Sequence, residues 1–111
     1  MTFDRFDVHV VPFPFSDRDK SKRRPALVIC DETFVARTGN VLLAMITSAK
    51  HSAWPYDCQI SEIENVGFSS ASIVRMRIST LATEQVGRKI GRLCSADISA
   101  VRAALKEAIL S

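Results

Sequence analysis

The sequence predicts a mainly β protein, in which several short strands form a small barrel or curled sheet and one C-terminal helix covers it. In the first two-thirds of the chain, short apolar and β-branched runs alternate with polar, turn-rich segments. Near the C-terminus the apolar spacing changes to that of a helix. The chain has 111 residues and a hydrophobic fraction of 47%, which suffices for one core. We therefore expect one domain over residues 1–111, of the small-barrel type.

The N-terminal part contains two predicted strands. Asp7–Val11 is rich in β-branched residues and leads into Pro12–Phe15, whose alternating prolines exclude a helix and suit an edge or bulged strand. Ser16–Arg23 is almost wholly polar, so we expect a solvated loop. Pro25–Cys30 is a continuous apolar run of strand length, which indicates a strand buried on both faces.

Further strands are predicted downstream. Thr38–Asn40 is a turn signal, and Val41–Thr47 after it reads as a second buried strand. Trp54–Ile60 and Ser72–Ile78 are expected to follow as strands. For Val86–Leu93 we favour a strand over a short helix.

The C-terminal segment has helical periodicity. Apolar residues recur at steps of three and four, which puts on one face Ile98, Val101, Leu105 and Ile109. Ser95 is the expected N-cap, and Asp97 in the first turn complements the helix dipole. Arg102 and Lys106 are expected on the opposite face.

Positive charge is clustered along the chain. The formal net charge of +3 and pI near 9.0 permit a nucleic-acid partner without requiring one. One cluster, within seven residues, comprises Arg18, Lys20, Lys22, Arg23 and Arg24. The second comprises Arg75, Arg77, Arg88, Lys89 and Arg92.

Cysteine usage and the N-terminus indicate a cytoplasmic protein without a metal centre. Cys30, Cys58 and Cys94 are widely separated and lack metal-ligand spacing, so we expect reduced, structural thiols and no cofactor. No apolar run approaches the roughly 20 residues needed to span a bilayer. The first residues lack the pattern of a signal peptide.

Two strand ends carry candidate chemistry. At Lys22–Pro25 a basic loop enters a buried strand, so rigid backbone holds an arginine that can meet a phosphate with paired N–H bonds. At Ile46–Ser48 a buried strand releases two hydroxyls into a polar loop. RNA carries its own nucleophile, the 2′-hydroxyl, so cleavage depends mainly on positioning and charge stabilisation. An arginine and a hydroxyl can supply both without a metal.

The order of these segments resembles the PemK/MazF toxin family, in its PemK-like branch. Asp7–Ile29, with Val-x-Val-Val-Pro-Phe-Pro-Phe and Arg-Arg-Pro-Ala-Leu-Val-Ile, resembles that family's N-terminal signature. Ile46–Ser48 resembles its second signature. The similarity continues through Trp54-Pro55-Tyr56, Gly67-Phe68, Ser72–Arg75 and Lys89–Leu93, and so covers nearly the whole chain.

The resemblance implies an SH3-like barrel that cleaves single-stranded RNA at short sequences to inhibit translation and growth. It implies a homodimer controlled by a cognate antitoxin, with operator DNA bound only as a complex with that antitoxin. The family's essential arginine maps onto Arg24 and its essential hydroxyl onto Thr47. An acidic loop residue maps onto Asp19, with Asp17 close enough to compete. The products would carry a 2′,3′-cyclic phosphate and a 5′-hydroxyl.

Other residues are candidates for substrate binding, each with a structural alternative. Arg23, Lys22 and Ser48 could contact RNA or simply lie in solvated loops. His51 could donate a proton near neutral pH or be inert.

Trp54 and Tyr56 could stack on unpaired bases or pack under the sheet edge. Arg75 and Arg77, two apart on a strand, could track an RNA backbone or be solvated. His9 between valines is expected to be structural.

Two rival functions remain open. The same barrel is found in the CcdB gyrase poison, which acts through its C-terminal helix, but the terminal tryptophan of that helix is missing from Ala108–Ser111. The other rival is a non-catalytic member of the fold that only binds nucleic acid or antitoxin.

Overall fold

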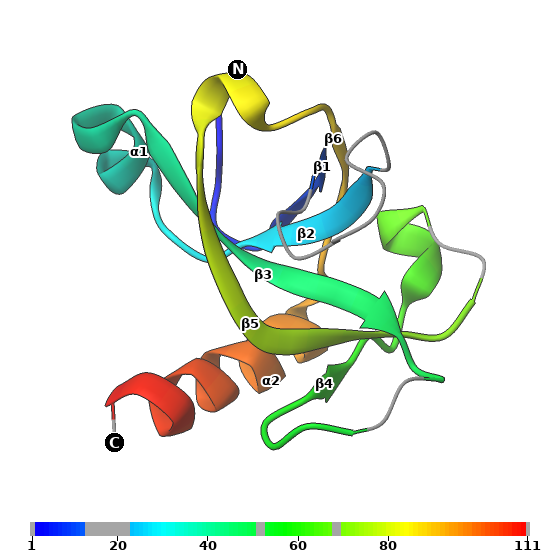
Figure 1. The fold of residues 1–111 in the computed structure, drawn as a ribbon. Coiled ribbons are helices and arrows are strands. Elements are labelled where there is room, and N and C mark those ends of the chain that lie inside the picture. The colour runs from blue at the N-terminus through cyan, green and yellow to red at the C-terminus, as the bar shows by residue number, and fades with distance from the viewer. Residues whose placement is uncertain (1, 13–22, 51–52, 68–69, 111) are drawn as a thin grey trace.

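The fold is an antiparallel sheet that curls tightly, with a helix along one side (Figure 1). The computed structural model describes residues 2–12, 23–50, 53–67 and 70–110. Within them the strands are β1 (Asp7–Val11), β2 (Arg24–Val28), β3 (Asn40–Ser48), β4 (Cys58–Gln59), β5 (Ser72–Ala82) and β6 (Lys89–Arg92). The helices are α1 (Glu32–Thr38) and α2 (Ser95–Leu105), with helical turns η1 (Ile63–Val66), η2 (Thr83–Gln85) and η3 (Lys106–Leu110). The predicted mainly β fold with a C-terminal helix is confirmed.

The strands lie in the order β4-β5-β3-β2-β1-β6, and every neighbouring pair is antiparallel. β5 contains an irregularity that bends it. Met45 of β3 is opposite Arg75, but the next pair along the strand joins Ala44 to Ile78. The residues between Arg75 and Ile78 therefore form a bulge, which sharpens the twist of the strand. Figure 1 shows β5 curving strongly along its length.

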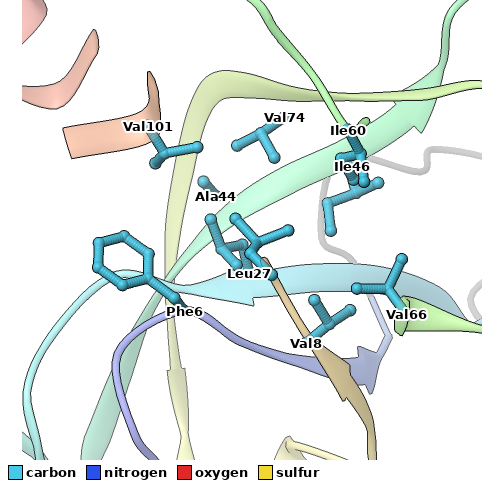
Figure 2. Close-up of a cluster of buried hydrophobic side chains, with 10 residues drawn as sticks. Phe6, Val8, Leu27, Ala44, Ile46, Ile60, Val66, Val74 and Val101 are labelled. Atoms are coloured by element: carbon cyan, nitrogen blue, oxygen red, sulfur yellow. The ribbon is translucent and has the colours of Figure 1, made fainter. Parts of the chain in front are cut away.

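Alternating side chains of β1, β2 and β3 fill two cores on opposite faces of the sheet. One core is buried beside the half-buried Phe34 and Val35 of α1, and comprises Phe3, Val11, Ala26, Val28, Cys30, Val41, Leu43, Leu81 and Val86. The other, which includes Val101 of α2 and Val66 of η1, contains Phe6, Val8, Leu27, Ala44, Ile46, Ile60, Val74 and Leu93 (Figure 2). The prediction that the second and third strands are buried on both faces is confirmed.

α2 packs on the sheet through the predicted stripe, but only over part of its length. Val101 is buried and Leu105 is half-buried, whereas Ile109, which lies beyond α2 in η3, is 56% exposed. The prediction is therefore wrong for Ile109. The expected N-cap is also one residue off, since Cys94 occupies that position and makes no side-chain capping bond.

Two elements differ from the sequence prediction. α1 was not predicted: the Asp31 carboxylate accepts the Phe34 N–H at 2.9 Å to start it, and Gly39, with φ 69°, ends it. The expected strand Trp54–Ile60 shrinks to β4. Its first half is a turn in which Tyr56 has φ 67° and the Asp57 N–H donates to the Trp54 carbonyl at 3.3 Å.

Part of the second basic cluster holds the sheet edge together. Asp7 is only 2% exposed, and its carboxylate lies 3.3 Å from Lys89 Nζ and 3.1 Å from Arg92 Nη1. These ion pairs join β1 to β6. None of the described helices is long and apolar enough to cross a membrane.

Candidate functional site

Arg24 and Thr47 flank the point where the central sheet divides. The pairing of β2 with β3 begins where Val28 is opposite Leu43 and ends where Ala26 is opposite Met45. Within the described residues these two strands are not paired beyond that point. β2 continues to Arg24, which pairs with Val11 of β1. β3 continues to Thr47 and Ser48, which pair only with β5. Figure 1 shows the two strands separating toward this end.

The register places the two candidate side chains on one face. Ala26 is opposite Met45, so continuing the alignment by two residues sets Arg24 opposite Thr47. Residues directly opposite on antiparallel strands project to the same side of the sheet. Arg24 is exposed and Thr47 is half-buried. The guanidinium and the hydroxyl therefore belong to the same face of the sheet, at the end where β2 and β3 separate.

A glycine lies against the neighbouring Arg23. A Cβ added to Gly87 would lie 2.6 Å from the Val10 carbonyl oxygen and 3.1 Å from Arg23 Nη1. The Gly87 N–H donates to the same Val10 oxygen at 2.7 Å. Only a residue without a side chain permits this close approach. Gly87 thus brings the segment after β5 against the start of β2, where exposed Arg23 lies beside Arg24.

Ser48 has a local structural role at the end of β3. The Ser48 hydroxyl accepts the Lys50 N–H at 3.2 Å, and the Ala49 N–H donates to Ala71 O at 3.0 Å. Ser48 therefore orders the turn at the end of β3, where it pairs with Ser72 of β5. Thr47 is the better placed of the two hydroxyls because it shares the face of Arg24.

Arg75 is buried and paired, so of its two alternatives the one in which it is simply solvated is wrong. Only 7% of the residue is exposed. Its Nε and Nη2 donate to the two carboxylate oxygens of Asp57, at 3.2 and 2.9 Å. The guanidinium carbon lies 4.9 Å from the centre of the Trp54 ring. Trp54 is 43% exposed and Tyr56 49%, so the alternative that they pack under the sheet edge is also wrong.

Asp57 is the residue of this site that the sequence did not reveal. Burial acts to raise its pKa, but the Arg75 hydrogen bonds, the Trp54 N–H and the Arg75 charge outweigh burial, so the pKa lies below the ordinary value. Asp57 is therefore ionised at neutral pH. Its partner Arg75 lies 18 residues away in the sequence, on β5, whereas Asp57 lies in the turn before β4.

The remaining candidates are placed as follows. Arg77 is half-buried within the β5 irregularity, so the simple alternation that would put it on the face of Arg75 does not hold there. Lys22, Asp17, Asp19 and His51 lie outside the described residues.

His9 and the cysteines stand apart from this chemistry. His9 is fully buried, its Nδ1 lies 2.9 Å from the Gly87 carbonyl oxygen, and its ring packs on Phe3, which confirms a structural role. Cys30, Cys58 and Cys94 are free thiols. Burial, with Asp57 and then Asp97, raises the pKa of Cys58, so this thiol stays protonated. The part of the chain that the structure describes holds no group of three or more potential metal ligands.

Several solved bacterial structures, including MazF toxins, have the same fold. A Mycobacterium tuberculosis toxin, MazF-mt6, aligns at 22% identity over 92% of this chain and 94% of its own, with a TM-score of 0.72. MazF in a MazE–MazF complex from Deinococcus radiodurans aligns at 17% identity over 99% of this chain and 97% of its own, with a TM-score of 0.74. A mycobacterial endoribonuclease, solved with its cognate antitoxin, aligns at 16% identity over 97% of this chain and 93% of its own, with a TM-score of 0.73. None of the curated proteins matches the chain in sequence.

The described residues of this chain, a curled antiparallel sheet with a C-terminal helix, thus have the fold of the MazF class of toxins. The sequence profile of the PemK-like, MazF-like toxins of type II toxin–antitoxin systems matches residues 4–109. The chain belongs to that family.

Proposed function

We propose that this toxin is a cytoplasmic endoribonuclease that cuts single-stranded RNA at selected sequences without a metal ion, with Arg24 and Thr47 at its active site. The observation that carries the proposal is the strand register, which aligns Arg24 with Thr47 on one face where β2 and β3 separate. Family membership supports RNA cleavage as the activity. So does the fold shared with proteins described as endoribonucleases.

Arg24 stabilises the transition state of phosphoryl transfer. The 2′-hydroxyl attacks the adjacent phosphorus and the 5′-oxygen of the next nucleotide leaves, so negative charge grows on the two non-bridging oxygens. A guanidinium can donate two parallel N–H bonds to those oxygens. Because Arg24 starts a strand that is paired with β1, its backbone is fixed before substrate arrives. Such preorganised donors stabilise developing charge without reorganising during the reaction.

Thr47 positions the reacting phosphate. Its hydroxyl can donate to a phosphoryl oxygen, and the pairing of Thr47 with Ile73 of β5 holds it in place. The two proton transfers need a further group, for which Asp19, Asp17 and His51 are the candidates. Arg23 and Lys22 would bind flanking phosphates.

The partners follow from the same proposal. MazF of Deinococcus radiodurans has been solved with MazE, and the mycobacterial endoribonuclease with its cognate antitoxin. We propose that this chain also forms a homodimer and is neutralised by a cognate antitoxin protein, with operator DNA bound only by the toxin–antitoxin complex.

The test is to incubate the purified protein with a long RNA in EDTA and to map the product ends. We expect cleavage at a small set of sequences, leaving 2′,3′-cyclic phosphate and 5′-hydroxyl ends. DNA gyrase should remain active. If the RNA stays intact and gyrase is inhibited, the protein is a gyrase poison and the proposal is wrong. If the RNA stays intact and gyrase remains active, the protein is a member of the fold that only binds its partners.

A further inference from the structure

Trp54 is held in a fixed orientation by a buried ion pair. The Arg75 guanidinium lies against its ring, with 4.9 Å between the guanidinium carbon and the ring centre. The Asp57 carboxylate accepts two hydrogen bonds from Arg75, at 3.2 and 2.9 Å. The same carboxylate accepts the Trp54 backbone N–H at 2.8 Å. Asp57 therefore fixes both the main chain that carries the indole and the cation beneath it.

The ion pair ties the turn to the sheet, because Asp57 lies in the turn and Arg75 lies in β5. The side chains of Arg75 and Asp57 are 9% and 12% exposed, whereas Trp54 is 43% exposed. Arg75 is opposite Met45 on β3, and Ile73 is opposite Thr47. Arg75 and Thr47 are thus diagonal neighbours on one face, with backbones about 7–8 Å apart. An aromatic ring lies open at one side of the Arg24–Thr47 pair.

The charges of this cluster do not favour a phosphate as its ligand. Asp57 neutralises the cation under the ring, and the ion pair is largely removed from water. What remains available is the flat, apolar surface of the indole. Nucleic-acid bases stack on such surfaces whatever their identity, because every base has a π face.

We propose that Asp57 is a positioning residue, which acts through Arg75 to hold Trp54 as a stacking platform for one unpaired base of the RNA. This inference rests on the proposed RNA substrate. The platform adds binding energy next to the scissile phosphate, and its contribution is independent of ionic strength. Sequence preference arises elsewhere, since stacking alone discriminates weakly between bases.

Trp54 is the only tryptophan of the chain, so its fluorescence reports on the platform alone. The probe is a mixed-sequence 2′-O-methyl RNA oligonucleotide, which cannot be cleaved because it lacks the 2′-hydroxyl nucleophile. We expect saturating oligonucleotide to quench Trp54 fluorescence in the wild-type protein. Unchanged fluorescence at saturation, with binding followed by a label on the oligonucleotide, would overturn the platform.

The Asp57→Ala variant tests the positioning role. Freed from the ion pair, Trp54 should show lower fluorescence anisotropy and greater quenching by acrylamide, and RNA binding should weaken roughly five- to a hundredfold. The Asp57→Asn variant keeps the size of the side chain and should give an intermediate effect. Glu64→Ala removes an exposed carboxylate from η1 and serves as the control for charge, with no change in any of these readouts.

The salt dependence separates this role from phosphate binding. Trp54→Ala should weaken RNA binding while leaving the slope of log affinity against log salt unchanged, whereas loss of one phosphate contact lowers that slope by about 0.7. With a cleavable RNA, Asp57→Ala should raise KM and leave kcat near the wild-type value. Wild-type anisotropy and affinity in Asp57→Ala would overturn the inference. A wild-type protein that binds RNA but never cuts it would instead overturn the proposed function.

Discussion

Arg24 aligns with Thr47 when the register of β2 and β3 is continued by two residues beyond their last pair, Ala26 with Met45. Each is held on its outer side, Arg24 by β1 and Thr47 by β5. The two side chains thus gain rigidity from different halves of the sheet, and among the described residues no β2–β3 pair joins the strands at their level. This relationship is the basis of the proposed active site.

Replacing Thr47 by valine tests the hydroxyl. Valine keeps the β-branched shape that suits a strand, so the fold and the melting temperature should be unchanged. We expect cleavage to slow about a hundredfold or more, as happens when one preorganised donor is removed from a transition state. Thr47→Ser, which keeps the hydroxyl, should retain most of the rate in the same single-turnover assay. Equal rates for the valine variant and the wild type would assign the role to another group.

Gly87→Ala should destabilise the protein by about 1–3 kcal/mol, measured by denaturant unfolding. The added methyl would meet the Val10 carbonyl oxygen at 2.6 Å, so the backbone must move and strain the Gly87–Val10 hydrogen bond. Adding Arg23→Ala should not restore stability, because the closer contact is with the backbone oxygen. Recovery in the double variant would show instead that Arg23 causes the clash.

The Asp57–Arg75 ion pair should make stability depend on pH in the acid range. Because the folded pKa of Asp57 is lowered, the ion pair stabilises the folded state fully above the unfolded pKa of about 3.9. That stabilisation is lost as the pH falls through the lower, folded pKa. Asp57→Asn should therefore unfold more easily by about 1.5–3 kcal/mol at pH 5–8. The difference should narrow below pH 4, and a constant difference down to pH 2 would contradict the assignment.

The sequence predicted elements that are marked by composition and missed those that depend on distant contacts. The run Val41–Thr47 was predicted within one residue at each end of β3, because a strand buried on both faces is apolar throughout. α1 was missed because none of its residues is fully buried, so no apolar stripe marks it. Its local signals are confined to its ends: the Asp31 cap, Glu32 in the first turn, Arg37 in the last turn and Gly39.

In the candidate site, too, some residues could be predicted from local sequence patterns and others depend on distant contacts. Arg24 and Thr47 could be chosen from local patterns and from the family resemblance, because each stands where a buried strand meets a polar segment. The role of Asp57 could not, since it depends on the pairing of β4 with β5, which brings residue 57 beside residue 75. The separation of β2 from β3 likewise follows from the register of three strands, and no local pattern encodes it.

The central claim is tested most directly by single-turnover cleavage of a mapped RNA in EDTA by Arg24→Ala and Arg24→Lys. Arg24 is exposed at the start of its strand, so both variants should keep the wild-type melting temperature. We expect Arg24→Ala to lose about a hundred- to a thousandfold in rate, because charge on the phosphoryl oxygens is left without its donor. Arg24→Lys should recover only part of that loss, since lysine keeps the charge but not the paired N–H bonds. Cleavage by folded Arg24→Ala at the wild-type rate would contradict the account.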